Sequence, residues 1–162
     1  MEKRIILITG ANRGLGAATG IKLSDQGHHV IFTARNNHKL SALKRQFSHK
    51  HSSVDFIPLD VRHPDSIIDS YHTIANHYPQ IDTLINNAGI YTSGTVDIST
   101  INDQAILEAF NTNTLGPLKI TQQFLPLIKQ SPEGIIVNVS SGMGAIVEMD
   151  SGSPAYRISK TA

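Results

Sequence analysis

The 162-residue sequence contains no cysteine, and this absence excludes a disulfide framework, a thiolate nucleophile and a cysteine-ligated metal site. An excess of one charge is also missing, because 14 lysines and arginines face 13 aspartates and glutamates and no basic cluster forms. We therefore expect no nucleic-acid partner. Eight histidines are present, but even the pair His49 and His51 lacks convincing ligand partners, so the sequence predicts no metal site.

Long hydrophobic runs are missing as well. The apolar run near the N-terminus, Ile5–Ile8, is too short for a signal peptide or a membrane span. We therefore expect no contact with a membrane and a cytoplasmic location. Hydrophobic residues make up 40% of the chain and charged residues 17%, which is the balance of a globular protein. This composition and the length predict a single domain over residues 1–162.

Apolar runs of strand length alternate with longer segments of helical periodicity. The predicted strands are Ile5–Ile8, His29–Ala34, 54–59, 81–85 and 135–139. The predicted helices are 17–26, 40–47, a helix that begins at Pro64, and a long segment, 103–129, that Gly116 and Pro117 should kink. Continuously apolar strands separated by helices indicate a parallel sheet covered on both faces. The expected fold is therefore a doubly wound, Rossmann-like α/β domain.

The first predicted strand runs directly into the glycine-rich sequence TGANRGLG, residues 9–16. Gly10, Gly14 and Gly16 follow the spacing Gly-x3-Gly-x-Gly, which differs from the commoner Gly-x-Gly-x2-Gly. Such a turn lets backbone N–H groups and the positive end of the next helix approach a pyrophosphate. An ordinary loop is the alternative for this motif alone. Because small and polar residues also follow the other strands, where ligands bind in such sheets, we favour a dinucleotide site.

The end of the second predicted strand distinguishes between two dinucleotides. An NAD site usually carries an acidic residue there, which binds the ribose 2′-hydroxyl and would repel a 2′-phosphate. This sequence has Ala34 followed by Arg35, and Arg13 lies in the glycine turn. Two guanidinium groups can bind a phosphate through charge-assisted hydrogen bonds, whereas isolated arginines are usually solvated surface charges. The missing acid and the two arginines together favour NADP over NAD.

Tyr156 and Lys160 are four residues apart, so a helix would place both on one face. Ser153 and Pro154 suit the cap and the first residue of that helix. A tyrosine with its ordinary pKa near 10 exchanges protons poorly at neutral pH unless a nearby cation stabilises the phenolate. Lys160 can be that cation, and an ordinary surface pair is the alternative.

Together these features resemble the classical short-chain dehydrogenase/reductase family, whose motifs occur here in the family's order. The matching motifs are TGANRGLG, Asp60, NNAG at 86–89, Asn113 within NTNTLGP, Ser141 within VNVSS, and YRISK from Tyr156 to Lys160. A basic residue in the glycine turn combined with TAR after the second strand is similar to the NADPH-using, carbonyl-reductase-like members. The resemblance implies an NADP(H)-dependent oxidoreductase that interconverts a small-molecule carbonyl and an alcohol by hydride transfer.

The resemblance also implies a role for each matched residue. Tyr156 would be the general acid/base, and Lys160 would lower its pKa and hold the nicotinamide ribose. Ser141 would orient the substrate oxygen, and Asn113 would anchor a water that relays protons through Lys160.

The same resemblance implies a set of residues at the cofactor. They are Gly10, Asn12, Arg13, Gly14, Leu15, Gly16, Arg35, Asp60, Val61, Asn87, Ala88 and Gly89, together with Tyr156 and Lys160. Asp60 and Val61 would contact the adenine. For the catalytic set, Ser140 and Asn111 remain weaker alternatives to Ser141 and Asn113.

Family members continue beyond the catalytic lysine, whereas this sequence ends at Ala162. The resemblance therefore implies that the C-terminal strands and helix of the family fold are missing. The helix from Pro154 would be short and the fifth strand would form an open sheet edge. Three interpretations follow: a truncated reductase, a non-catalytic dinucleotide-binding module or inactive fragment that lacks the substrate-binding C-terminal part, and a chain that does not fold stably alone. A homo-oligomer through the long helix or the open edge is compatible with the first two.

Overall fold

The computed structural model describes residues 2–47, 53–91, 99, 101–148 and 152–162. Its centre is a five-stranded sheet with the strand order β3-β2-β1-β4-β5, in which every pairing is parallel. The strands are β1 (Ile5–Ile8), β2 (His29–Ala34), β3 (Val54–Pro58), β4 (Thr83–Asn86) and β5 (Ile135–Asn138). The doubly wound, Rossmann-like fold predicted from the sequence is confirmed, with strand ends that shift by one or two residues.

The strand order reverses next to β1. The chain passes from β1 outward to β2 and β3, and then returns to β4, which pairs with β1 on its other side. Because Ile8 of β1 is in register with Ile85 of β4, the carboxyl ends of these two strands lie side by side. In open α/β sheets the crevice outside such a switch point is where ligands bind.

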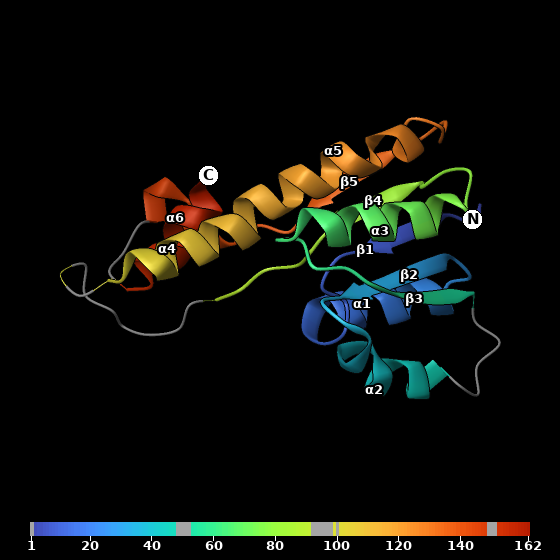
Figure 1. Ribbon diagram of the computed structural model, residues 1–162, viewed down its shortest axis with the longest axis horizontal. Coiled ribbons are helices and arrows are strands. Elements are labelled where there is room, and N and C mark those ends of the chain that lie inside the picture. The colour runs from blue at the N-terminus through green and yellow to red at the C-terminus, as the bar shows by residue number, and fades with distance from the viewer. Residues whose placement is uncertain (1, 48–52, 92–98, 100, 149–151) are drawn as a thin grey trace.

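Helices cover both faces of the sheet and create two hydrophobic cores (Figure 1). Helices α1 (Gly14–Asp25) and α2 (Asn37–Phe47) pack on one face, where Phe32 stacks against Phe56 and contacts Phe47. Helices α3 (Pro64–Ala75) and α5 (Gly116–Ile128) cover the other face, and Phe124 of α5 is completely buried there. Burial on both faces explains why the central strands are continuously apolar.

The long predicted helix 103–129 is not a single α-helix. It consists of α4 (Asp103–Phe110), a π-helical turn (Asn111–Leu115) and α5. Pro117 lacks an N–H group, so the regular hydrogen bond to the carbonyl of residue 113 is impossible and the helix widens before it. The predicted interruption therefore takes the form of a π-turn, and Asn113 lies within it.

The C-terminal part of the described chain lies against α4. Two short 3₁₀ helices (Gly142–Gly144 and Ile146–Glu148) follow β5, and α6 (Pro154–Thr161) packs beside α4 (Figure 1). All four residues of β5 are exposed, and among the described residues no strand pairs with its outer side. A search of the same residues finds no helix with the length and apolarity needed to cross a membrane.

Candidate cofactor and active site

The glycine turn between β1 and α1 approaches β4 more closely than any larger residue would allow. Gly10 has φ +63°, and a Cβ there would lie 2.7 Å from the Cα of Ala88. A Cβ on Gly16 would collide with the side-chain amide of Asn87. Gly14 also has a positive φ, of +58°, but its Cβ would meet nothing. Gly10 and Gly16 are therefore needed for close packing, whereas Gly14 leaves open space at the start of α1.

The N-terminus of α1 has free hydrogen-bonding capacity. Its cap residue, Arg13, has an extended backbone and makes no side-chain capping bond. The N–H groups of the first turn, which have no partners within the helix, therefore carry the partial positive charge of the helix end. This is the arrangement that accommodates an anionic pyrophosphate.

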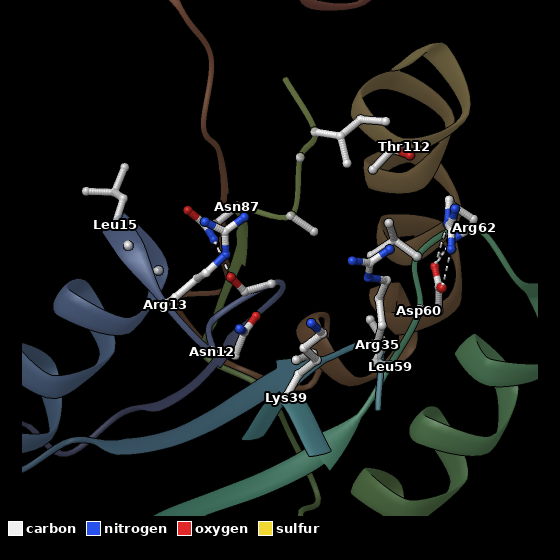
Figure 2. A pocket seen from close by; sticks show the side chains of 18 residues that line it. Asn12, Arg13, Leu15, Arg35, Lys39, Leu59, Asp60, Arg62, Asn87 and Thr112 are labelled. Carbon is white, nitrogen blue, oxygen red and sulfur yellow. Dashed lines mark hydrogen bonds and ion pairs between the residues drawn. The ribbon is translucent and has the colours of Figure 1, made fainter. Parts of the chain in front are cut away.

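A pocket of about 330 Å³ lies over the glycine turn and the carboxyl ends of β1 to β4 (Figure 2). All twelve predicted cofactor residues outside α6 line it. They are Gly10, Asn12, Arg13, Gly14, Leu15, Gly16, Arg35, Asp60, Val61, Asn87, Ala88 and Gly89. The structure thus brings together in one cavity residues that are as far as 79 positions apart in the sequence.

Six further lining residues were missed by the sequence reasoning: Ala34, Lys39, Leu59, Arg62, Ile90 and Thr112. Lys39 is the most informative of these, because its amino group points into the pocket beside Arg35 (Figure 2). It lies in the first turn of α2, and its backbone N–H donates to Asn36 Oδ1 at 3.0 Å. The sequence offered one signal for this residue, which is that a second cation follows Arg35 by four positions.

Asp60 lies in the pocket wall but its carboxylate is already paired. Arg62 binds both oxygens, with Nε 3.1 Å from Oδ1 and Nη2 2.8 Å from Oδ2. Burial alone would raise the pKa of Asp60, but the hydrogen bonds and charge of Arg62 outweigh it and lower the pKa. Because Asp60 and Arg62 neutralise each other, the charge left among the lining residues is the positive charge of Arg13, Arg35 and Lys39.

Asn87 locks the ends of β1 and β4 together beneath this pocket. Its Nδ2 donates to the carbonyl oxygens of Thr9 at 2.9 Å and Gly10 at 3.1 Å. Its backbone N–H and that of Ala88 both donate to Thr9 Oγ1 at 3.0 Å. These hydrogen bonds connect the ends of the two central strands and hold the glycine turn in place.

Helix α6 carries Tyr156 and Lys160 on one side, as the spacing predicted. The ammonium group of Lys160 lies 6.0 Å from the centre of the Tyr156 ring and donates to the carbonyl oxygen of Val139 at 2.8 Å. Burial lowers the pKa of Lys160. Lys160 and Asn113 line a second pocket of about 450 Å³, next to the first, and Ala88 lines both.

The side-chain amide of Asn113 is engaged by protein groups. Its Oδ1 accepts from the N–H of Ile90 at 2.8 Å, and its Nδ2 donates to the Ile90 carbonyl and to Ser159 Oγ, both at 2.9 Å. Both amide hydrogens are therefore used to connect the segment after β4 with α6. A water relay through this residue would have to use its other atoms.

Ser141 and Tyr156 line neither of the two pockets, whereas Ser140, the weaker alternative, lines the second. Ser141 Oγ caps the first 3₁₀ helix by accepting from the N–H of Met143 at 3.2 Å. The buried guanidinium of Arg157 on α6 donates to the carbonyl oxygens of Met143, Glu148 and Gly152. It thereby holds the segment after Ser141 against the helix that carries Tyr156.

The start of α6 corrects one detail of the sequence prediction. Pro154 is the first helical residue as expected, and Ser153 precedes it, but the Ser153 side chain does not cap the helix. Its backbone is left-handed, with φ +49°, and its Oγ forms a 2.7 Å hydrogen bond with the hydroxyl of Tyr91. The expected cap is therefore replaced by a tertiary contact.

Known proteins of similar sequence are reductases and dehydrogenases. An NADPH-dependent pterin aldehyde reductase from Arabidopsis thaliana is 36% identical over 143 residues, which cover 87% of this chain and 57% of that protein. A short-chain dehydrogenase from Penicillium roqueforti is 36% identical over 150 residues and is covered to 59%. The chain thus spans less than two thirds of the length of these curated relatives.

Solved structures match as well. The NADPH-bound carbonyl reductase from chicken fatty liver superimposes with a TM-score of 0.89 at 29% identity, covering all of this chain and 70% of that one. The putative carbonyl reductase Sniffer of Caenorhabditis elegans gives a TM-score of 0.87 at 31% identity and is covered to 76%. The family model for short chain dehydrogenase matches residues 4–162, and the chain therefore belongs to the short-chain dehydrogenase family.

Proposed function

We propose that this chain contains the cofactor site and the catalytic residues of an NADP(H)-dependent oxidoreductase that interconverts a carbonyl and an alcohol. The observation that carries the proposal is that all twelve predicted cofactor residues outside α6 line one pocket, next to a second pocket that is lined by Lys160 of the helix that also carries Tyr156. Family membership supports it, because the curated relatives are named as dehydrogenases and reductases.

The pocket fits a dinucleotide on its own chemistry. Gly14 leaves open space at the start of α1, where the first-turn N–H groups have no side-chain cap, so a pyrophosphate could be bound there. Asn12 and Leu15 complete this part of the wall. Arg35 follows the end of β2, where a ribose 2′-phosphate would extend, Lys39 lines the same pocket from the first turn of α2, and Arg13 adds a third cation.

The preference for NADP over NAD rests on these charges. No acidic residue directly follows β2, and the carboxylate that lines the pocket, Asp60, is paired with Arg62. A 2′-phosphate would therefore meet positive charge that no lining carboxylate offsets. The NADPH-dependent and NADPH-bound relatives support the same preference.

The reaction divides between the cofactor and the chain's own residues. A bound nicotinamide supplies the hydride. Tyr156 donates a proton to the substrate oxygen during reduction and takes it back during oxidation. The positive charge of Lys160, near the Tyr156 ring, stabilises the phenolate that remains. Ser141 donates a second hydrogen bond to the substrate oxygen through its hydroxyl hydrogen, because its bond with the Met143 N–H uses only a lone pair of Oγ.

The substitution Tyr156→Phe tests the proton donor. It removes the hydroxyl but keeps the ring, so we expect turnover with aldehydes, ketones or quinones to fall by a factor of about 100 or more while NADPH binding stays unchanged. Nicotinamide fluorescence measures binding, and oxidation of NADPH measures turnover in the same sample. Retention of most of the activity in the variant would refute the assigned role.

Titration of the wild-type chain with NADPH, followed by addition of carbonyl substrates, also separates the three interpretations of the chain. NADPH binding with turnover supports the reductase, and binding without turnover supports a cofactor-binding module, whereas no binding supports a chain that needs further sequence. The non-catalytic alternative is not favoured, because the named relatives are enzymes of the same family. Cytoplasmic location and oligomerisation stay predictions.

A further inference from the structure

Tyr91 makes two contacts with the start of α6 that the proposed mechanism does not use. Its ring meets the Tyr156 ring edge to face, with centroids 4.8 Å apart and planes inclined by 69°. Its hydroxyl forms the 2.7 Å hydrogen bond with Ser153 Oγ. One side chain therefore contacts both the proposed proton donor and the residue that directly precedes its helix.

The backbone that carries Tyr91 is held in place. The preceding residue, Ile90, exchanges two hydrogen bonds with the side-chain amide of Asn113, and the same amide donates to Ser159 on α6. The segment after β4 is thus connected to α6 near both of its ends, through Ser159 and through Ser153. A displacement of Tyr91 relative to α6 would break contacts at both places.

Ser153 shows that the tertiary contact prevails over local preference. Among the described residues it is the one non-glycine with a positive φ, and it is 94% buried, with 6% exposed. A serine before a helix ordinarily uses its hydroxyl to cap the first turn. Here the left-handed backbone directs that hydroxyl to Tyr91 instead. The hydrogen bond to Tyr91 thus accompanies a backbone conformation that is uncommon for serine.

The proton donor needs such support. Tyr156 is the third residue of an eight-residue helix, and a helix of this length is not stable without tertiary packing. Proton transfer requires the phenol to lie within hydrogen-bond reach of the substrate oxygen. A small rotation of the first turn or of the Tyr156 side chain would remove that alignment.

The geometry points to Tyr91 as a positioning residue for Tyr156, acting through its ring edge and through its bond to Ser153. This inference rests on the proposed function, in which Tyr156 is the proton donor. Tyr91 is 55% exposed, so its substitution leaves the two cores of the fold intact. Its loss should therefore change the alignment of Tyr156 rather than the stability of the protein.

Two substitutions separate the two contacts. Tyr91→Phe keeps the ring and loses the Ser153 bond, and we expect kcat to fall about threefold, whereas Tyr91→Ala loses both contacts and should lower kcat about 30-fold. The affinity for NADPH and the thermal midpoint should stay unchanged in both variants. Ser153→Ala should match Tyr91→Phe, and adding it to Tyr91→Phe should have no further effect, because both remove the same bond.

Control variants test whether the effect is general. Tyr71→Phe changes a tyrosine that packs on Phe124, away from α6, and Ile68→Ala removes another exposed large side chain. Neither should lower kcat. An unchanged kcat in Tyr91→Ala, or a fall that the two controls reproduce, would overturn the inference.

A measurement without turnover keeps this test independent of the proposed function. The chain has four tyrosines, so the ring signals of ¹³C-labelled tyrosine can be assigned by single Tyr→Phe variants. With NADPH bound, Tyr91→Leu should shift the Tyr156 ring signals because the neighbouring ring current is lost. A protein without turnover but with this shift would contradict the proposed function alone, and unchanged Tyr156 signals would contradict the role of Tyr91 as a positioning residue.

Discussion

At the scale of single residues, the charge of the cofactor pocket decides which dinucleotide it should accept. Arg35 and Lys39 point into one space from the end of β2 and the first turn of α2 (Figure 2). Arg35 was predicted from its place after the second strand. Lys39 was not, because one lysine on a helix is usually a solvated surface charge, and only the structure shows that it lines the same pocket as Arg35.

Arg35→Ala and Lys39→Ala test this arrangement. Each should weaken NADPH binding by a factor of about 10 and leave NADH binding nearly unchanged, since only NADPH carries the 2′-phosphate. Lys22→Ala, which removes an exposed lysine from the far end of α1, is the control and should change neither affinity. Equal losses for NADPH and NADH would place the phosphate elsewhere.

At the scale of elements, the sequence predicted strands and helices well where periodicity was long and unambiguous. Pro117 predicted an interruption of the long helix but not its form, because the π-turn is also held by the Asn113 contacts with Ile90 and Ser159. The position of α6 was also beyond prediction. The position of α6 depends on the contact of Ser153 with the distant Tyr91 and on the contact of Arg157 with Met143, which lies in a short 3₁₀ helix.

The packing of α1 on the sheet gives a prediction about Gly20. A Cβ there would collide with the ring of Phe32, which is completely buried and lies against Phe47 and Phe56. Gly20→Ala should therefore destabilise the protein by about 1–3 kcal/mol and weaken NADPH binding, because α1 carries the glycine turn. Ala18→Leu, at an exposed position of the same helix, should do neither. Thermal unfolding and cofactor titration measure both effects.

A higher melting temperature for Gly20→Ala would contradict this packing. Alanine is the better helix former by about 1 kcal/mol, so the substitution would be stabilising if the helix were free to accept it. The sign of the change therefore reports whether α1 is held against Phe32.

At the scale of the whole molecule, Asp82 joins parts of the chain that lie far apart in sequence. Its carboxylate accepts hydrogen bonds from the Ile5 N–H at 2.7 Å, from Gln80 at 2.6 Å and from Ser131 at 2.7 Å. Its backbone pairs with Ile5 and Ile135. Burial alone would raise the pKa of Asp82, but these hydrogen bonds and the charge of Arg4 outweigh it and lower the pKa below 3.8.

The stability of the protein should depend on pH through this group. Because the folded-state pKa is depressed, the unfolded chain binds more protons as the pH falls, so the contribution is complete well above pH 3.8 and is lost as the pH falls through the folded-state value. Asp82→Asn should cost about 1–3 kcal/mol at neutral pH and less in acid. Urea unfolding across this pH range, with the exposed Asp69→Asn as control, measures the difference.

The sequence by itself determined the alternation of strands and helices, the glycine turn and the order of the family motifs, because these depend on residues that are close together in the chain. The tertiary structure decided which of these residues meet. It brought twelve predicted residues and Lys39 into one pocket, directed the Asn113 amide to Ile90 and Ser159, and turned Ser153 from its expected cap to Tyr91. The physical reason is that such contacts satisfy hydrogen bonds and bury surface between distant segments, where local propensity has no influence.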